Sequence, residues 1–493
     1  MMLKKNIITY FLILFSLFFL SLQIYLERYF GVVDFEQFIV FLSFGVTGLL
    51  DSDDYIIIKF IQICILLPLA ITFILYLLTK LTYFSNKIYL VNKISSIIKK
   101  ANIYLSFFFL IISVLFFLKS ISFDDFISRD NKGDFIRNNY VKPNLKDFLD
   151  VESTKDLILI YVESMEDVFL NKDFISESSI KKFQFDELGA KKFKKFKATK
   201  YTNWTTGSIV ATQCGIPQKP VGIFDTQNMK LNRNKPNKFG IAMKNFLPNA
   251  YCIGDLLKVS NYKNVFINAV DSNFAATGLF FKEHGYEEIY DKKYFKKSNY
   301  DYDSYTWGGG PNDSVLLDFA KTKIVNFKQN KERFNVTILT TDTHEPGFID
   351  NKCTSSMNTN YNRLSKALVC TSESLFNFVK FVENNFSEDT AIVIFGDHLY
   401  PKLLDLNLNN TGQERTLYNR IISKNFSIYR DLINHYDLFP TILNLLNFSF
   451  KNNRLGLGFS AVKSTDINNY DNYFKNLQKN IQNKSDYYIE FWK

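Results

Sequence analysis

Residues 157–163 read Leu-Ile-Leu-Ile-Tyr-Val-Glu, a continuous apolar run that ends in a carboxylate. A run without polar alternation is typical of a strand that is buried on both faces of a parallel sheet. Similar runs lead toward His344 and into Asp397 and His398. Open α/β sheets place their sites at the carboxyl ends of their strands. The sequence therefore predicts a doubly wound α/β domain of about 300 residues with its chemistry along one edge.

Three apolar segments precede this domain, at residues 7–26, 55–78 and 103–118. They approach or reach the length of about 20 residues that a membrane-spanning helix requires. A fourth apolar segment, residues 35–50, contains a glutamate, a glutamine and two glycines. We interpret this segment as an extracytoplasmic loop or a re-entrant piece, so the sequence predicts three spans.

Lysines set the orientation of these spans. Lys4 and Lys5 precede the first apolar segment, and the loop between the second and third contains Lys80, Lys87, Lys93, Lys99 and Lys100. By the positive-inside rule both regions are cytoplasmic, which three spans satisfy and four do not. The first segment is too long for a signal-peptide core and lacks a small-residue cleavage site, so it should remain as an anchor. The chain after residue 120 is then exported.

Composition suggests four parts of the chain. They are a membrane domain at 1–120, a polar juxtamembrane linker at 121–150, the α/β domain at 151–462 and a C-terminal tail at 463–493. The linker is polar and unpatterned. The tail is polar and tyrosine-rich, and the sequence assigns it no role.

Four of the five cysteines lie in the exported part: Cys214, Cys252, Cys353 and Cys370. Disulfides persist in that compartment, so an even number favours bridges, with three possible connectivities. The formal net charge of +10 suits a protein beside anionic head groups. No segment has the pattern of a nucleic-acid-binding module, so we expect a membrane partner and no nucleic acid. The basic residues 181–200 form either a solvated face or a contact for lipid phosphate.

A hydroxyl-rich turn at residues 202–208 opens into a short apolar run that Gly215 and Pro217 close. This pattern is typical of a loop that feeds one or two turns of helix. The unpaired N–H groups and positive dipole end of a helix start favour negative charge. Thr205 is therefore a candidate for a hydroxyl that acts as an alkoxide and takes a phosphoryl group. The alternative is an ordinary helix cap.

Two carboxylates, an imidazole and a hydroxyl form a candidate metal site: Glu163, Asp397, His398 and Thr205. This mixture of oxygen and nitrogen ligands suits one Zn²⁺ or Mn²⁺ ion, and Mg²⁺ less well because of the histidine. Such a metal would lower the pKa of the Thr205 hydroxyl and neutralise charge on a transferring phosphoryl group.

Short motifs between residues 155 and 460 resemble those of one enzyme family. They include Tyr161-Val162-Glu163-Ser164, Trp204-Thr205, Gln213-Cys214-Gly215-Ile216-Pro217, Thr343-His344-Glu345-Pro346 and Gly396-Asp397-His398. These motifs resemble those of the membrane phosphoglycerol transferases, above all the members that act on periplasmic glucans. The family belongs to the alkaline phosphatase and sulfatase superfamily, alongside lipoteichoic acid synthases and lipid A phosphoethanolamine transferases.

The resemblance implies an alkaline-phosphatase-like domain in the periplasm, carried by a multi-pass protein of the cell inner membrane. It implies four metal ligands: Glu163, Thr205, Asp397 and His398. Thr205 would also be the nucleophile, and His344 would face the donor or the leaving group as an acid or hydrogen-bond donor.

The resemblance also pairs Cys214 with Cys252 and Cys353 with Cys370. The candidate substrate contacts are Trp204, Asn273 and Trp307. We interpret His284 and His435 as structural, His435 because it lies beside a helix start.

Departures from the family pattern concern the head-group contacts and the nucleophile. Lipoteichoic acid synthases carry a Trp and an Arg for the glycerol phosphate group in the segment that corresponds to residues 271–282, which has no arginine here. Extra glycines follow Trp307. Thr206 competes with Thr205 for the nucleophile role, and we prefer Thr205 because it directly follows Trp204.

The leading interpretation is a ping-pong transferase. Thr205 attacks phosphatidylglycerol, diacylglycerol leaves, and a hydroxyl of an exported oligosaccharide or other glycan displaces the phosphoglycerol. The alternatives are phosphoethanolamine transfer to lipid A or a glycan, and a catalytically silent membrane-anchored binding protein. Sulfatase activity is disfavoured because formylglycine formation needs Cys or Ser followed by x-Pro-x-Arg, and the sequence after Cys214 lacks that spacing.

Overall fold

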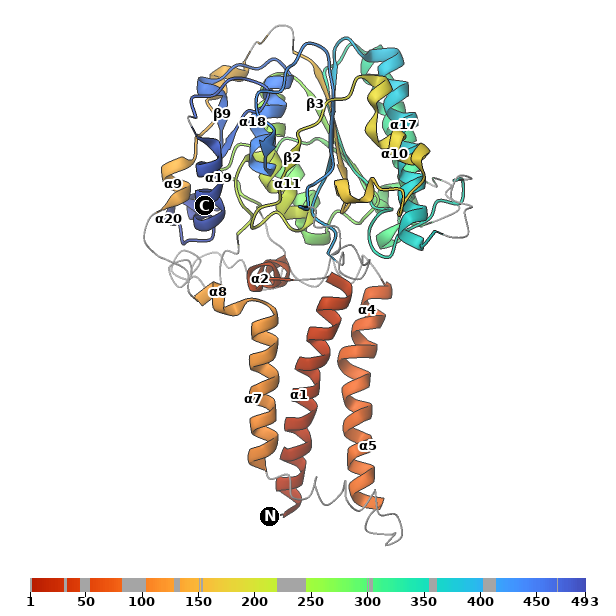
Figure 1. The fold of residues 1–493 in the computed structure, drawn as a ribbon, viewed down its shortest axis with the longest axis vertical. Helices are drawn as coiled ribbons and strands as arrows, with labels where there is room; N and C mark the ends of the chain where they lie inside the picture. The colour runs from red at the N-terminus through yellow and green to blue at the C-terminus, as the bar shows by residue number, and fades with distance from the viewer. Residues whose placement is uncertain are drawn as a thin grey trace. The chain divides into compact units, whose positions relative to one another are not determined.

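The computed structural model describes residues 2–30, 33–44, 54–81, 103–127, 134–149, 151, 154–219, 245–298, 300, 305–353, 361–401, 414–467 and 469–493. The chain forms two compact units (Figure 1). The first comprises residues 1–39 and 53–128, and the second comprises residues 40–52 and 129–493. Four of the lysines that we predict to be cytoplasmic lie outside the described residues: Lys87, Lys93, Lys99 and Lys100.

Long helices make up the first unit. α1 (Met2–Phe30) packs between α7 (Ile103–Ser120) and a second helical rod (Figure 1). That rod consists of α4 (Asp54–Phe60), a π-helical stretch at Ile61–Leu66 and α5 (Leu67–Leu81). Ring contacts join the helices: Phe19 of α1 lies 5.7 Å from Phe117 of α7, and Tyr25 of α1 lies 5.3 Å from Phe60 of α4, between centroids.

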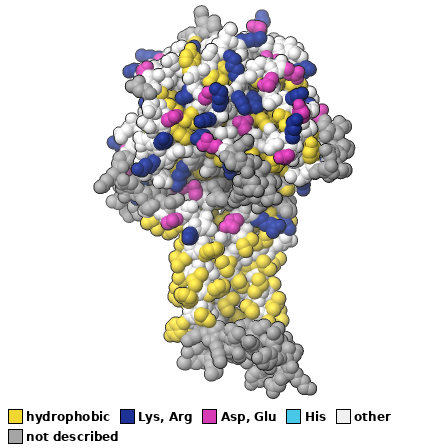
Figure 2. Space-filling view, in the orientation of Figure 1, with side chains coloured by type: hydrophobic (Ala, Val, Ile, Leu, Met, Phe, Trp, Pro, Cys, Tyr) yellow, Lys and Arg dark blue, Asp and Glu magenta, His cyan; other side chains and the backbone are white. Residues whose placement is uncertain are grey.

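Three stretches of these helices are long and apolar enough to cross a membrane: Ile7–Phe30, Ile57–Leu78 and Ile103–Ser120. Their outer surfaces are apolar, as Figure 2 shows, and Phe11 and Phe73 are each more than half exposed. Water would make such a surface costly, at roughly 25 cal/mol per Å². Lipid removes that cost, so the three predicted spans agree with the helices.

The ambiguous fourth apolar segment contains only a short helix. α2 (Phe35–Phe44) has ten residues, about half of the length that a span needs. Its Phe35 and Ile39 pack with Phe117 and Ile121 near the end of α7, which continues through a bend into α8 (Phe123–Ile127). Residues 45–50 of the segment lie outside the described residues.

A six-stranded sheet with the order β4-β3-β5-β1-β6-β7 forms the centre of the second unit. Its strands are β1 (Asp156–Val162), β3 (Lys263–Asn268), β4 (Glu288–Tyr290), β5 (Phe334–Leu339), β6 (Thr390–Gly396) and β7 (Asn419–Ile422). The first five are parallel, and β7 pairs antiparallel with β6 at the edge. Two small sheets accompany it: β2 (Lys195–Phe196) with β8 (Leu432–Ile433), and β9 (Arg454–Leu455) with β10 (Gly458–Phe459).

Side chains of β1 point alternately into two cores, one on each face of the sheet. Leu157, Leu159 and Tyr161 join one core, whereas Ile158 and Ile160 join the other. All are fully buried because helices cover both faces. This arrangement confirms the predicted doubly wound α/β domain and explains the uninterrupted apolar run, since neither side of β1 meets water.

The two faces carry different helices. The first core contains α11 (Thr205–Cys214), α13 (Ile253–Val259), α14 (Thr277–Glu283) and α18 (His435–Leu445). The second contains α10 (Glu177–Gln184), α15 (Lys292–Lys297), α16 (Asp313–Gln329) and α17 (Arg363–Phe386). Short 3₁₀ turns occur at Leu145–Phe148, Asp167–Phe169, Asp186–Leu188, Phe274–Ala276, Trp307–Gly309 and Lys451–Asn453.

Parts of the linker and of the C-terminal tail pack on the domain. Within the linker, α9 (Phe135–Asn139) buries Phe135 and Ile136, and Phe148 is fully buried in the first core. The C-terminal helices α19 (Tyr470–Asn480) and α20 (Asp486–Glu490) pack on the same core. Scattered aromatic residues anchor both segments to the domain. Most of their neighbours in the sequence are polar, so the sequence pattern does not predict this role.

Candidate metal and nucleophile site

Neighbouring strands bring the candidate ligands together at the carboxyl edge of the sheet. Glu163 directly follows β1, and Asp397 directly follows β6, which pairs with β1 as far as Val162 and Gly396. A Cβ at Gly396 would lie 1.8 Å from the carbonyl oxygen of Met165. Glycine is therefore required there, because the chain after β1 crosses close to the end of β6.

The ligand atoms of Glu163, Asp397 and His398 all lie within 4.8 Å of one another. His398 Nε2 lies 3.3 Å from Glu163 Oε1 and 3.6 Å from Asp397 Oδ2. Thr205, the first residue of α11, donates its hydroxyl to Glu163 Oε2 over 3.4 Å. The four candidates that the sequence separates by up to 235 positions therefore surround one small volume.

Ser164 ties the two carboxylates together. Its amide donates to Asp397 Oδ1 over 2.7 Å, and its hydroxyl donates to Glu163 Oε1 over 2.8 Å. The residue has φ 51°, a left-handed conformation that non-glycine residues adopt at a cost of about 1–2 kcal/mol. The sequence does not predict this role of Ser164, although its position directly after Glu163 at a strand end is a signal.

Burial and mutual charge perturb all three titratable groups. Burial would raise the pKa of Glu163, but the neighbouring His398 and His344 lower it. Burial and the charge of Glu163 raise the pKa of Asp397. Burial would lower the pKa of His398, but Asp397 and Glu163 raise it to about 10. A proton on His398 therefore offsets part of the negative charge of the two carboxylates, and a cation could take over that role.

The donor set fits a divalent metal. Asp397 Oδ2 is buried and has no hydrogen-bond partner within the described chain. His398 Nδ1 lies 3.0 Å from the Leu399 carbonyl oxygen, which only accepts, so Nδ1 keeps its proton and Nε2 can bind a cation that displaces the second proton. Metal-binding histidines are commonly held in this way by a backbone carbonyl. A carboxylate oxygen without a hydrogen-bond partner and a fixed imidazole meet the needs of a Zn²⁺ or Mn²⁺ site.

His435 supports Asp397 from behind. Its Nε2 donates to the Asp397 carbonyl oxygen over 2.7 Å, and burial lowers its pKa to about 3, so the ring is neutral. The residue begins α18. This contact agrees with the structural role that we predicted and gives it a location.

Thr205 and Thr206 have different surroundings. Thr206 is buried and donates its hydroxyl to Gln218 Oε1 over 3.0 Å, whereas Thr205 is half-buried and faces Glu163. The Trp204 indole also donates to Gln218 Oε1, over 2.6 Å, and only 4% of Trp204 is exposed. Trp204 therefore holds the start of α11 in place, and its role as a substrate contact stays a prediction.

His344 and Trp307 form a stacked pair at the same edge of the sheet. Their ring centroids lie 4.5 Å apart at an interplanar angle of 23°, and Phe274 packs edge-on against Trp307 at 5.3 Å. His344 Nδ1 lies 3.0 Å from the Glu345 carbonyl oxygen, so Nδ1 is the donor and Nε2 is left for a substrate. The neighbouring candidate Asn273 is exposed, and its side chain makes no hydrogen bond within the described residues.

Two buried aspartates connect the loops that carry this stacked pair. Asp313 accepts the amides of Thr341 and Asp342 over 2.8 and 3.2 Å, and Asp342 accepts the amide of Asp313 over 3.0 Å. Burial raises the pKa of both carboxyls, that of Asp313 to about 6. No local sequence pattern marks this reciprocal pair, because its two members lie 29 residues apart.

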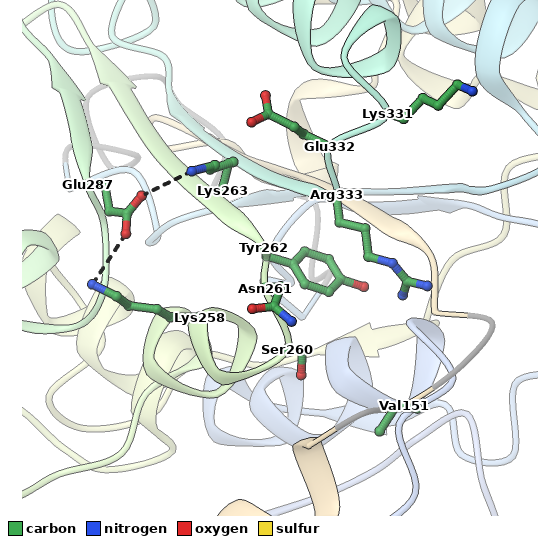
Figure 3. Close-up of a pocket in the computed structure, with 10 residues that line it drawn as sticks. All are labelled: Val151, Lys258, Ser260, Asn261, Tyr262, Lys263, Glu287, Lys331, Glu332 and Arg333. Atoms are coloured by element: carbon green, nitrogen blue, oxygen red, sulfur yellow. Dashed lines mark ion pairs between the residues drawn. The ribbon is translucent and has the colours of Figure 1, made fainter.

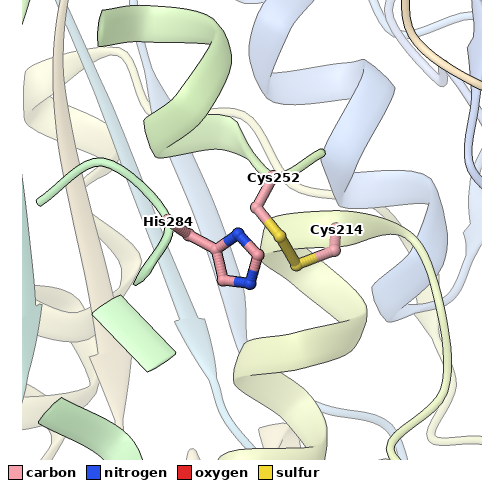
Figure 4. Close-up of side chains that lie close together, drawn as sticks. All are labelled: Cys214, Cys252 and His284. Carbon is pink, nitrogen blue, oxygen red and sulfur yellow. A yellow bond between two sulfur atoms is a disulfide. The ribbon is translucent and has the colours of Figure 1, made fainter. Parts of the chain in front are cut away.

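Both disulfides that the family resemblance implies are present. Cys214 is bonded to Cys252, and Cys353 is bonded to Cys370. His284 lies beside the first bridge (Figure 4). Its Nδ1 is hydrogen-bonded to Asp255 Oδ2 at 2.9 Å, and its Nε2 is hydrogen-bonded to the Phe246 carbonyl oxygen at 3.0 Å. Both ring nitrogens are engaged and the sulfurs are bonded to each other, so this group is structural and not a metal site.

A basic cavity of about 670 Å³ lies at the amino ends of the parallel strands, opposite the carboxyl ends that carry Glu163 and Asp397 (Figure 3). Its lining includes Lys263 at the start of β3 and Arg333 just before β5. Because these strands are parallel, their amino ends lie away from Glu163 and Asp397. The cavity holds none of the candidate catalytic residues.

The basic residues 181–200 partly pair within the domain. Lys194 lies 2.8 Å from Asp431, and Lys197 lies 2.5 Å from Glu414. Lys191 donates to the Phe426 carbonyl oxygen over 2.8 Å. These contacts favour a solvated face over a lipid-binding surface.

Two curated relatives match most of the chain. The chain is 28% identical over 389 residues to phosphoglycerol transferase I of Shigella flexneri, covering 74% of this chain and 46% of that protein. Phosphoglycerol transferase I of Escherichia coli is also 28% identical, over 358 residues, covering 69% of this chain and 42% of that protein. The chain therefore spans about half the length of these curated relatives.

Among solved structures, a protein of the alkaline phosphatase superfamily from Vibrio parahaemolyticus has a TM-score of 0.47 and 16% identity, covering 68% of this chain and 75% of that one. The phosphoglycerol transferase GacH of Streptococcus pyogenes has a TM-score of 0.43 and 16% identity, with coverages of 70% and 88%. The sulfatase family profile matches residues 155–448, more than half of the chain and the whole of the central sheet. This chain therefore belongs to the sulfatase family.

Proposed function

We propose that the protein transfers a phosphoglycerol head group from phosphatidylglycerol to an exported glycan, through a covalent phosphoglycerol adduct on Thr205. The observation that carries this proposal is the Thr205 hydroxyl, which lies 3.4 Å from Glu163 in the cluster with Asp397 and His398. Thr205 stands at the start of a helix, where N–H groups and the dipole favour the negative charge of a phosphoryl group.

The residues proposed to hold the metal are Glu163, Thr205, Asp397 and His398. A bound divalent cation would lower the pKa of the Thr205 hydroxyl and neutralise charge on the phosphoryl group. Ser164 and His435 fix the carboxylate and carbonyl groups of this cluster, so its geometry is set before substrate binds.

The reaction has two steps at phosphorus. Beside a bound cation the Thr205 hydroxyl would first lose its proton to solvent. Thr205 Oγ1 forms a bond to phosphorus while the bond to the diacylglycerol oxygen breaks, and protonated His344 delivers the Nε2 proton that the leaving alkoxide needs. A glycan hydroxyl then bonds to phosphorus, and the Thr205 oxygen leaves. The proton of the glycan hydroxyl restores the starting protonation of the site. Trp307 keeps the His344 ring in position by stacking on it.

The apolar helices support a lipid donor. A donor confined to a leaflet has a high effective concentration for an enzyme that is anchored in the same membrane. With the predicted orientation, the domain lies in the periplasm and the helices lie in the inner membrane. Similarity to proteins named phosphoglycerol transferase I supports phosphoglycerol as the transferred group.

Although the chain belongs to the sulfatase family, we do not propose sulfate-ester hydrolysis. A threonine stands at the start of α11, and Cys214 is bonded to Cys252. No thiol is therefore free in α11 for conversion to formylglycine.

Labelled phosphatidylglycerol tests the proposal. Purified full-length protein with Mn²⁺ should release diacylglycerol and accumulate a labelled adduct, which peptide mass spectrometry should locate on Thr205. Thr205→Ala should abolish the adduct, whereas the matched Thr206→Ala should retain it. Label on Thr206, or turnover without an adduct, would contradict the mechanism. Faster release from phosphatidylethanolamine would instead identify a phosphoethanolamine transferase.

A further inference from the structure

A second cavity, of about 320 Å³, lies on the first core side of the domain. Three segments line it: the end of α9, the chain before α13, and α20. Its lining residues that bear on function are Tyr140, Lys142, Asn249, Tyr251, Tyr487 and Glu490. Its volume is at the lower end of the range for small-molecule sites.

Aromatic packing fixes the walls of this cavity. The Tyr140 ring lies 4.9 Å from Phe491 and 5.8 Å from Tyr487, between centroids. The amide of Asn249 donates to the Phe491 carbonyl oxygen over 3.2 Å, and its side chain donates to the Glu490 carbonyl oxygen over 3.1 Å. The segments before α13 and after α20 are therefore joined, so the walls are in place without a ligand.

Polar groups around the cavity remain available. Within the part of the chain that the structure describes, the hydroxyls of Tyr140, Tyr251 and Tyr487 make no hydrogen bond. The Lys142 ammonium lies 5.3 Å from the centroid of the Tyr251 ring and has no ion pair there. The lining contains one basic and one acidic side chain, Lys142 and Glu490, and the Glu490 carboxylate is paired with Lys493.

These features suit a neutral, polyhydroxylated ligand. The C–H faces of sugar rings pack on aromatic rings, whose faces carry negative charge, while sugar hydroxyls bond with phenol, amide and ammonium groups. The basic cavity of Figure 3 differs, because four cations there face two carboxylates, which suits an anion. We propose that the cavity at Tyr251 and Tyr487 is a subsite for sugar rings of an oligosaccharide.

The cavity is connected to the nucleophile through one helix. Tyr251 precedes Cys252, which is bonded to Cys214 at the end of α11, and Thr205 begins that helix. Ten residues of helix span about 15 Å. The subsite therefore suits rings of the acceptor that are remote from the reacting hydroxyl. This role in transfer rests on the proposed function, whereas sugar binding does not.

Calorimetry on the full-length protein in detergent, with laminarihexaose as the probe, tests the subsite. Tyr251→Ala and Tyr487→Ala should each weaken binding by about threefold to tenfold, the effect of losing one aromatic contact. Tyr251→Phe keeps the aromatic ring and should weaken binding less than Tyr251→Ala does. Tyr429→Ala is the control, because Tyr429 is 63% exposed and lies outside the cavity. Absent binding by the wild type, or equal binding by all variants, would overturn the proposal.

Two further measurements separate the possible outcomes. Inorganic phosphate that binds to the wild type but not to Lys142→Ala would identify an anion site and overturn the sugar subsite. In transfer assays, Tyr251→Ala should raise KM for laminarihexaose by the same factor and leave KM for glucose unchanged. Equal rises in KM for laminarihexaose and for glucose would show that the subsite is not remote from the reacting hydroxyl, and would overturn that part of the proposal. Sugar binding without any transfer would leave the subsite standing and would contradict the proposed function.

Discussion

The backbone amide of Ser164 donates to Asp397 Oδ1 over 2.7 Å, across 233 positions of sequence. The hydroxyl of the same serine donates to Glu163 Oε1 over 2.8 Å. One residue in a left-handed conformation thereby fixes the distance between two buried carboxylates. Their charges would otherwise drive them apart, so this contact sets the geometry of the proposed metal site.

Ser164→Gly should weaken metal binding while the fold is retained. Glycine accepts the left-handed φ and keeps the amide bond to Asp397, but it loses the hydroxyl that holds Glu163. Loss of an outer-shell contact commonly costs about 10- to 100-fold in metal affinity. Calorimetric titration with Mn²⁺ measures this change. Ser387→Gly, just after α17 and remote in sequence, is the control, and equal affinity in both variants would refute the role of Ser164.

Glu163→Gln and Asp397→Asn should each remove most of the bound metal. Both changes preserve shape but delete a negative charge, so the affinity for Mn²⁺ should fall by more than about 100-fold, beyond the loss of an outer-shell contact. Metal analysis after dialysis at pH 7 provides the measurement. Asp318→Asn, on the exposed face of α16, should bind like the wild type. Full metal content in Asp397→Asn would place the ion elsewhere.

His344→Gln should slow release of diacylglycerol by about 10²- to 10⁴-fold, the usual contribution of a positioned acid. The defect should shrink with a p-nitrophenyl phosphodiester, because its leaving group needs no proton. Rates of adduct formation with the two donors measure the difference. An equal loss with both would assign His344 to binding and not to acid catalysis. Trp307→Phe keeps a ring that can stack on His344, so it should slow diacylglycerol release less than Trp307→Ala does.

The buried pair Asp313 and Asp342 should make stability depend on pH. The pKa of Asp313 rises from 3.8 to about 6 on folding, so the folded state holds its proton more tightly. The resulting stabilisation is complete below pH 3.8 and is lost as the pH rises through about 6. The pKa of Asp342 is raised in the same direction.

Asp342→Asn should flatten this dependence, because it removes one of the two carboxyls whose pKa folding raises. Thermal unfolding between pH 4.5 and 7.5, with chelator present, compares the variant with the wild type. As the pH rises over this range, the unfolding midpoint temperature of the wild type should fall further than that of the variant. Asp318→Asn serves again as an exposed control. Parallel pH curves for wild type and Asp342→Asn would contradict the coupling.

The sequence determined the main features of the fold. Because β1 meets an apolar core on each face, its composition had to be uniformly apolar, and residues 157–162 therefore predicted a central parallel strand. The three spans were similarly predictable, since a bilayer demands a long stretch without charge. The candidate ligands Glu163, Asp397 and His398 could be found because parallel strands end at one edge.

The tertiary structure alone decided which side chains meet. Ser164, His435 and Gln218 act through single hydrogen bonds to residues that are distant in sequence, and no local pattern marks such pairs. The choice between Thr205 and Thr206 depends on helix rotation, which sends one hydroxyl to Glu163 and the other to Gln218. The aromatic residues of α9 and α20 lie in segments whose sequences look like a linker and a tail. They are buried because they pack against the first core, and only the tertiary structure shows that contact.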